Sequence, residues 1–244
     1  MGFFGQGRWP PSLEAPLQDG PVAVDVRVHP RARGYRLTVT SSGAARLTVP
    51  PHGRRREAED FLRRHAGWLE ARLARTPDRV PFDDGARVPL RGVDHVIVAT
   101  GKLRGTVSIA GMGPEPALLV PGGPDHLARR LIDFLKREAK TDLEAQVAIH
   151  ARTLGVRPTA IRLRDQSARW GSCASSGRLN FNWRLIMAPG FVLDYVAAHE
   201  VAHLVEMNHS PAFWAAVERA LPDMKRGRAW LKANGGRLMA YGER

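Results

Sequence analysis

The stretch His199-Glu200-Val201-Ala202-His203 decides the fold of this chain, and a third histidine, His209, follows it. The apolar residues around the stretch recur mostly at helical spacing, and neither Gly nor Pro occurs between residues 191 and 207. Residues four apart on a helix lie about 6 Å apart along the axis and point nearly the same way. The sequence therefore predicts a helix that presents two imidazoles to one metal ion.

Glu200 lies about 100° around the predicted helix from the histidine that precedes it. A carboxylate at this angle stands beside the two imidazoles rather than between them. That position suits a general base, which must contact a water on the metal without taking a ligand position. We therefore expect Glu200 to be catalytic.

The third histidine lies just before a second predicted helix. The pair Ser210-Pro211 is typical of an N-cap and a first helical turn, and Ala212–Leu221 continues at helical spacing. The first helix must therefore end before residue 210, and Asn208 is best suited to a left-handed turn there. Such a reversal can bring His209 back towards the first two histidines. Three histidines leave one coordination position open, which is the arrangement of a catalytic zinc site.

Length and charge set broad limits on what the chain can be. It has 244 residues, of which 43% are hydrophobic, enough for one large or two small domains. The net charge of +13 favours an anionic partner and makes nucleic acid a candidate. The best candidate surface is the arginine-bearing helix predicted over Arg54–Arg75, although acidic residues dilute its charge. An arginine-rich composition without a binding role is the alternative explanation.

Cysteine usage and hydropathy bear on the compartment. The single cysteine, Cys173, allows no intramolecular disulfide and fits a reducing compartment. The first 17 residues contain no continuous apolar segment of the kind that a signal peptide needs. No apolar run approaches the ~20 residues of a membrane helix. We expect a cytoplasmic protein without a membrane segment.

Composition divides the chain into three parts. Residues 1–20 are rich in Gly and Pro and are expected to be flexible. Residues 21–122 alternate as short strands and contain one helix, so this part is expected to be mainly β. Residues 123–244 form the predicted catalytic domain. No internal repeat is evident.

The clearest linker signal is the stretch Pro121-Gly122-Gly123-Pro124. Asp125 can cap a long helix after it, and Gly155 is the expected end of that helix. The linker therefore separates the mainly β part from an α+β part.

Two further stretches lie between the long helix and the metal helix. Arg169-Trp170-Gly171-Ser172-Cys173 is predicted to be a loop, and Arg178–Ile186 a strand with one apolar and one polar face. The polar face carries Asn180 and Asn182. Because an extended peptide can add to a strand edge through main-chain hydrogen bonds, these residues are candidates for substrate binding. A packing loop and an ordinary core strand are the alternatives.

Taken together, these stretches resemble the YgjP-like metallopeptidases, which are related to the SprT and WLM zincins. The resemblance rests on Arg169–Cys173, on Leu179–Leu185 and on the motifs within Tyr195–Trp214. It extends more weakly through the N-terminal part. The histidine spacing also matches metzincins, but Glu206 stands where their glycine would be, so we do not expect a metzincin.

The resemblance implies an α+β fold with a zincin-like catalytic domain, in which helices pack on a small mixed sheet. It also implies a zinc ion held by His199, His203 and His209, with Glu200 as the base. A zinc-dependent peptidase that hydrolyses a peptide or protein substrate is the function that follows.

Further candidates and alternatives remain open at this point. Tyr195, one turn before His199, and Arg169 are two further candidates for substrate binding, each as a second donor to the developing oxyanion, with packing as the alternative role. A metal-stabilised module that binds protein or nucleic acid and cleaves nothing is a rival function. The intact Glu200 argues against that module, because a zinc scaffold needs no carboxylate beside an open position. Hydrolysis of a non-peptide amide is a second alternative.

Overall fold

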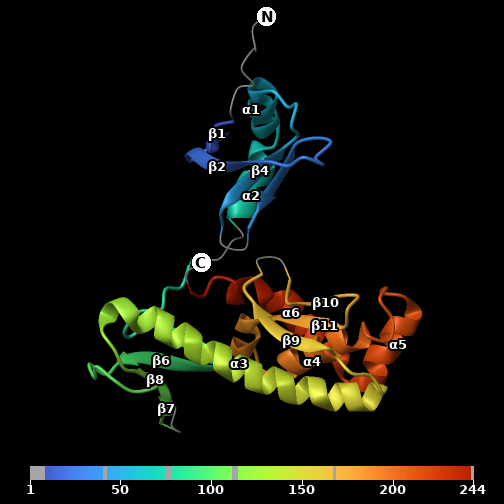
Figure 1. Ribbon diagram of the computed structural model, residues 1–244. Coiled ribbons are helices and arrows are strands. Elements are labelled where there is room, and N and C mark those ends of the chain that lie inside the picture. Colours follow the sequence, from blue (N-terminus) through green and yellow to red (C-terminus); the bar gives the residue numbers. More distant parts are fainter. Residues whose placement is uncertain (1–8, 41–42, 75–78, 112–114, 167–168, 243–244) are drawn as a thin grey trace, which may run out of the picture. The chain divides into compact units, whose positions relative to one another are not determined.

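The computed structural model describes residues 9–40, 43–74, 79–111, 115–166 and 169–242. It divides into two compact units, Met1–Asp78 and Arg79–Arg244 (Figure 1). Small mixed sheets and helices make up both units, which confirms the predicted α+β fold class. Within the described parts of the chain, every helix is too short or too polar to cross a lipid bilayer.

The first unit is a four-stranded sheet packed against two helices. Its strands run in the order β1-β2-β4-β3, with antiparallel hairpins β1–β2 and β3–β4 joined by the parallel pair β2–β4. The elements are β1 (Ser12–Leu17), β2 (Gly20–Val28), β3 (Arg36–Val39), β4 (Ala45–Val49), α1 (Arg55–Arg64) and α2 (Ala66–Leu73). Alternation along the strands buries one face, where Val24 and Leu47 pack with Leu62 and Leu69 of the helices.

Two features of this unit differ from the sequence predictions. Strand β1 falls within the segment expected to be flexible, yet it pairs along its whole length with β2 and buries Leu13 and Ala15. Residues 1–8 of that segment lie outside the described residues. The single helix predicted over Arg54–Arg75 is two helices, broken at His65, whose backbone angles are φ −107° and ψ 12°. The apolar pattern continues across the break because both helices face the same core.

The second unit opens with another four-stranded sheet, in the order β5-β6-β8-β7. Its strands are β5 (Arg87–Leu90), β6 (Val93–Ala99), β7 (Ser108–Ala110) and β8 (Ala117–Val120). Helix α3 (Pro124–Leu154) follows and extends from the β6–β8 sheet to the β9–β11 sheet (Figure 1). As predicted, Gly155 ends α3 in a left-handed conformation, with φ +69°. Gly123 rather than Asp125 is the N-cap residue, and it makes no side-chain cap.

The two units share one topology, so the chain contains an internal repeat that was not evident from the sequence alone. In each, two antiparallel hairpins are joined by a central parallel pair and followed by helix. Asp-Phe-Leu-Arg-Arg at 60–64 corresponds to Asp-Phe-Leu-Lys-Arg at 133–137, and Leu-Glu-Ala at 69–71 to the same tripeptide at 143–145. The spacing between the matching stretches is one residue shorter in the first unit, where the helix breaks at His65.

The boundary between the units lies before β5, not at the predicted linker near residue 122. Leu90 and Ile97 of the β5–β8 sheet share one hydrophobic core with Leu131 and Leu135 of α3. The stretch 121–124 is a tight strand-to-helix turn, in which the Gly122 N–H donates to the Lys102 carbonyl at 2.7 Å. Glycine and proline mark such a turn as strongly as they mark a linker.

The rest of the second unit is a three-stranded sheet with helices around it. Its strands, in the order β10-β11-β9, are β9 (Ala160–Arg164), β10 (Gly171–Cys173) and β11 (Arg178–Asn182). A 3₁₀ helix η1 (Trp183–Met187) and the helices α4 (Gly190–Ala202), α5 (Pro211–Ala220) and α6 (Met224–Leu238) complete the unit. The predicted loop at 169–173 thus contains the short strand β10. The predicted strand at 178–186 ends at Asn182, where the Asn182 side chain caps the 3₁₀ helix.

Candidate metal centre

Helix α4 carries the H-E-x-x-H stretch, with His203 as its C-cap residue, and most of its residues are buried. It packs against α3, α5, α6 and β10, and it is buried on nearly all sides. A hydrogen-bonded contact adds to this packing, since His150 Nε2 of α3 lies 2.6 Å from Oδ1 of Asp194, five residues before the first histidine. The backbone that presents the site is therefore held from several directions.

The chain reverses after α4 and brings His209 beside His199 and His203. One potential ligand atom from each histidine lies within 4.8 Å of the others. The prediction of a left-handed turn at Asn208 in this reversal is wrong. Among the described residues, Arg91 is the one non-glycine residue with a positive φ. The reversal uses tight turns instead, with the Val205 and Glu206 N–H groups both donating to the Ala202 carbonyl.

The predicted helix restart is confirmed at α5. The Ser210 hydroxyl accepts a hydrogen bond from the Phe213 N–H at 3.3 Å, and Pro211 occupies the first turn. This places the fully buried Phe213 ring under the histidines, stacked on His203 with ring centres 4.4 Å apart. The same ring meets His199 edge-on at 4.9 Å. The imidazoles are thus oriented by packing.

The three histidines fit a metal ion by their chemistry as well as their spacing. His203 Nδ1 lies 3.2 Å from the Glu206 carbonyl, which can only accept, so the lone pair is on Nε2. His209 Nε2 and His199 Nε2 face each other at 3.2 Å, a contact that needs a proton or a cation between the lone pairs. Burial and the neighbouring histidines lower the pKa of His199 to about 3, which keeps it neutral as a metal ligand must be.

Glu200 is buried beside the histidines, with 5% of its surface exposed. Burial raises its pKa to about 8, and the positive charge of Arg169 opposes that rise. Its Oε2 has no hydrogen-bond partner within the described structure. Gly171 makes room for this carboxylate, because a Cβ at position 171 would lie 2.7 Å from Glu200 Cδ. The glycine of the predicted loop is therefore required by close approach to the glutamate.

A cavity of about 220 Å³ opens beside Glu200 and His199. It is lined by Arg169, Trp170, Gly171, Tyr195, Val196, His199, Glu200 and Leu231. Two of the four predicted substrate residues, Arg169 and Tyr195, therefore reach it. Tyr195 is mostly buried and meets the His199 ring edge-on at 6.0 Å, so it also has a packing role.

The other two predicted substrate residues do not line this cavity. They lie on β11, which is the central strand of its sheet and is paired on both edges, so no peptide can add to it. Asn182 is fully buried; its amide donates to the Gln166 carbonyl at 2.8 Å and accepts from the Arg184 N–H at 3.0 Å. Asn180 donates to the Ser172 hydroxyl at 3.3 Å. Both residues have internal structural roles.

Strand β10 is the edge of this sheet nearest the site. The Asn182 N–H donates to the Trp170 carbonyl and the Ala174 N–H to the Arg178 carbonyl, at 2.8 and 2.9 Å. In an antiparallel pair the hydrogen-bonded positions alternate, so the main-chain groups of Gly171 and Cys173 face away from β11. The open edge therefore begins at the glycine that contacts Glu200.

Sequence reasoning missed Arg228 on α6. Its guanidinium lies over the Trp214 ring, 4.4 Å from the ring centre, and its charge contributes to the low pKa of His199. No sequence motif identifies Arg228 as a residue near the site, because α6 is brought there only by its packing against α4. At Gly227 the backbone approaches Tyr195, and a Cβ there would lie 3.0 Å from the tyrosine Cγ.

The free cysteine is not among the candidate ligands. Cys173 is half-buried, and burial raises the pKa of its thiol, which disfavours the thiolate that binds metals. It lies on β10 rather than with the three histidines.

Comparison with known proteins identifies the family of this chain. The model of the family described as YgjP-like, metallopeptidase domain, matches residues 33–234. No curated protein matches the chain significantly. One similar solved structure is the crystal structure of the metallopeptidase zymogen of Pyrococcus abyssi abylysin, at 22% identity and a TM-score of 0.34, covering 37% of this chain and 93% of that chain. The family match spans most of the chain and includes all three histidines, so this protein belongs to the YgjP-like metallopeptidase family.

Proposed function

We propose that this metallopeptidase is a zinc enzyme that hydrolyses peptide bonds, with His199, His203 and His209 as metal ligands and Glu200 as general base. One observation carries the proposal. A buried carboxylate lies on the same helix as two imidazoles, and all three imidazoles offer ligand atoms within 4.8 Å of one another.

The three histidine ligands support zinc as the metal of this metallopeptidase. Three neutral imidazoles with an open fourth position are typical of catalytic zinc sites, although imidazole also suits copper, nickel and iron. When bound, zinc would polarise the substrate carbonyl and lower the pKa of a coordinated water towards ~7.

Glu200 takes a proton from the attacking water and transfers it to the leaving amine. Its buried position supports this role, because desolvation makes the carboxylate a stronger base than an exposed one. Gly171 leaves the carboxylate free to approach the reacting atoms, since any side chain there would occupy the same space.

The open edge of β10 is the proposed path of the substrate main chain. An extended peptide that adds to Gly171 and Cys173 would run past Glu200, with one side chain directed into the 220 Å³ cavity. Arg169 and Tyr195 line that cavity and are the candidate donors to the developing oxyanion.

Nucleic-acid binding is not part of the proposal. On α1, which is part of the predicted surface, two arginines are engaged by acidic neighbours: Arg55 is paired to Glu59 and Arg63 to Asp60, each at 2.7 Å. Pairs of this kind reduce the positive charge that is available to a phosphate.

A peptide-library screen tests the proposal against the rival binding module. Purified zinc-loaded protein should cleave a subset of the library, and chelation followed by zinc addition should abolish and then restore cleavage. Glu200→Gln is the matched control and should be silent. Silence of the wild-type protein across the whole library, together with tight capture of one partner, would favour the non-catalytic module. Cleavage confined to non-peptide amides would keep the chemistry and change the substrate.

A further inference from the structure

The cavity of about 220 Å³ beside Glu200 has one permanently charged cation in its wall, the guanidinium of Arg169. Apart from Glu200, none of the residues that line it is acidic. Pockets for drug-sized molecules hold about 300–1,000 Å³. The cavity is smaller than that, so it suits a single side chain of a bound peptide.

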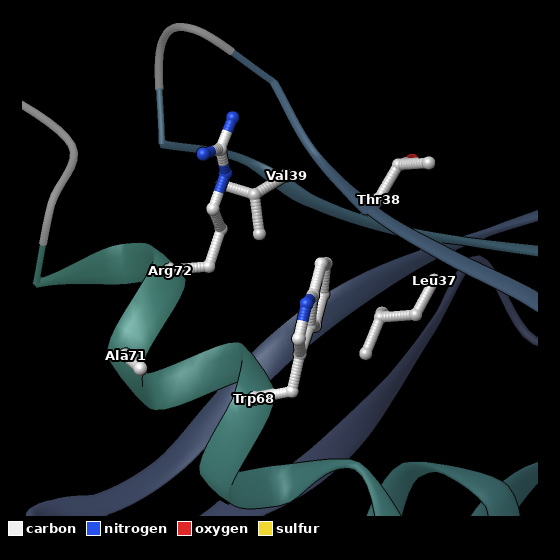
Figure 2. A pocket seen from close by; sticks show the side chains of 6 residues that line it. All are labelled: Leu37, Thr38, Val39, Trp68, Ala71 and Arg72. Carbon is white, nitrogen blue, oxygen red and sulfur yellow. The ribbon is translucent and has the colours of Figure 1, made fainter.

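A groove of about 360 Å³ in the first unit, between β3 and α2, differs in kind from this cavity. Figure 2 shows Trp68 standing between the helix and the strand. The residues that line the groove include no carboxylate, imidazole or thiol, so none of them could ligate a metal or transfer a proton. A residue that determines which peptide bond is cleaved is therefore expected in the cavity beside Glu200.

Strand β10 directs Arg169 towards the face that contacts Glu200. The β10–β11 register continues to Trp170, whose carbonyl accepts from the Asn182 N–H at 2.8 Å. Side chains two residues apart on a strand share a face. Gly171 is on the face that contacts the carboxylate, since a Cβ there would lie 2.7 Å from Glu200 Cδ. Arg169, two residues earlier, lines the same cavity, and its charge reaches Glu200.

The charges that other elements bring to Glu200 and His199 are positive. Burial raises the pKa of Glu200, and Arg169 opposes that rise. Burial and the neighbouring histidines lower the pKa of His199, and Arg228 of α6 adds to that effect. Within the described parts of the chain neither arginine forms an ion pair, and Arg228 lies over the Trp214 ring. A substrate carboxylate that enters the site therefore meets two arginines that carry no other carboxylate.

An acidic side chain complements this cavity better than the other kinds of side chain. A carboxylate can accept two parallel hydrogen bonds from a guanidinium, and its methylene groups can pack against the apolar wall, which includes Trp170 and Leu231. A Lys or Arg side chain would meet a like charge. An apolar side chain would cover the guanidinium without replacing its hydrogen bonds to water.

We propose that this peptidase selects acidic substrates, and that Arg169 is the specificity-determining residue. It binds the carboxylate of a Glu or Asp side chain that enters the cavity from a residue flanking the scissile bond. The net charge of +13 adds a long-range attraction for acidic peptides. The inference rests on the proposed function, and it leaves Tyr195 as the candidate donor to the oxyanion.

Quenched fluorescent peptide libraries test the inference with zinc-loaded full-length protein. One position is fixed as Glu, Gln, Leu or Lys, and this position is moved along otherwise randomised short peptides. Glu and Gln have nearly the same shape, so their comparison isolates the charge. With the fixed residue at one position beside the scissile bond, the Glu library should be cleaved at least about 10-fold faster than the Gln library, and the Lys library should be slowest.

Variants assign the preference to one side chain. Arg169 is exposed, so its replacement should leave the fold intact. Arg169→Gln should slow cleavage of the Glu library at least about 10-fold and change that of the Gln library by less than about 2-fold. Arg169→Glu should shift the preference towards the Lys library. Arg162→Gln, at an exposed residue of β9 on the other edge of the sheet, is the matched control and should behave as wild type.

Steady-state kinetics separate this role from stabilisation of the oxyanion. For the best single Glu peptide, Arg169→Gln should raise KM with little change in kcat, because the side-chain contact is made equally in the bound substrate and in the transition state. Loss of an oxyanion donor would instead lower kcat for the Glu peptide and its Gln counterpart alike.

Peptide binding gives a readout without cleavage. In fluorescence anisotropy with metal-loaded Glu200→Gln, the labelled Glu peptide should bind at least about 10-fold more tightly than its Gln counterpart. Adding Arg169→Gln to this chain should remove the difference between the two peptides.

Several outcomes would overturn the inference and leave the peptidase proposal standing. These are equal cleavage of the Glu and Gln libraries at every position, a Glu preference that survives Arg169→Gln, and an equal loss on all libraries in that variant. Silence of every library would refute the proposed function, and the inference would fail with it. The two failures are therefore distinguishable.

Discussion

Replacing Glu200 by glutamine should stabilise the metal-free protein at alkaline pH. The carboxyl is 5% exposed, and burial raises its pKa to about 8 from an ordinary value of 4.5. A group whose pKa is higher in the folded state contributes full stability below its unfolded pKa and loses it as pH rises through the folded pKa. Ionised Glu200 therefore opposes folding when no metal is bound.

The size of the effect follows from the same two values. At about pH 8 the unfolded chain has released the proton completely and the folded chain has released half of it. With 1.36 kcal/mol for each pKa unit, the difference of about 3.5 corresponds to about 4 kcal/mol at that pH, and to less than about 1 kcal/mol near pH 5. Local relaxation would reduce these figures, so we expect a gain of about 2–4 kcal/mol for Glu200→Gln near pH 8.

Urea denaturation of chelator-treated protein measures this gain directly. The difference in unfolding free energy between Glu200→Gln and wild type should grow from about pH 5 to about pH 8, and it should shrink when metal is restored, because a cation stabilises the carboxylate. Glu218→Gln, at an exposed residue of α5, is the matched control and should show no such growth. A wild-type protein that is as stable as the variant at pH 8, or a difference independent of pH, would refute the reasoning.

Three further changes have expected outcomes. Gly171→Ala should lower stability by about 1–3 kcal/mol and abolish hydrolysis, because the Cβ overlaps the buried carboxylate. Gly236→Ala, where the Cβ meets open space on α6, is the control for Gly171→Ala; thermal denaturation of both variants should show it to be neutral or stabilising by up to ~1 kcal/mol. Asp194→Ala should cost about 1–3 kcal/mol in urea denaturation by leaving buried His150 unpaired, and an unchanged midpoint would remove the anchoring role. Zinc removal should increase hydrogen exchange over residues 204–210 more than in β2; equal protection in both forms would count against His209 as a ligand.

The parts of the site that were predictable are those encoded locally. Helical periodicity puts His199 and His203 on one face, and Ser210-Pro211 caps the next helix, so the gathering of three histidines follows from about a dozen neighbouring residues. The route of the reversal was predicted wrongly at Asn208, because several turns can connect two helices over the same distance.

The parts that could not be predicted depend on which distant segments meet. Nothing in the alternation of residues 178–182 reveals that β9 occupies one edge of β11 and β10 the other, and this pairing makes Asn180 and Asn182 internal. Arg228 reaches the site because Gly227 lets α6 approach α4, which is again a contact between distant segments. The boundary was misplaced at 121–124 because a tight turn and a linker use the same residues.

The repeat was not predicted from the sequence because the two units share only two short stretches of similar residues. Short strands of a few residues carry weak patterns, and the two matching stretches lie on helices that differ in continuity. Strand order and pairing sense, which define the repeat, are properties of the folded chain.

The most direct test of the central claim is to measure zinc content and peptide hydrolysis on the same preparations of wild type, Glu200→Gln and His209→Ala. We expect about one zinc per chain in wild type and in Glu200→Gln, with hydrolysis reduced at least about 100-fold in the latter, and loss of both zinc and hydrolysis in His209→Ala. Retained hydrolysis in Glu200→Gln, or full zinc content in His209→Ala, would contradict it.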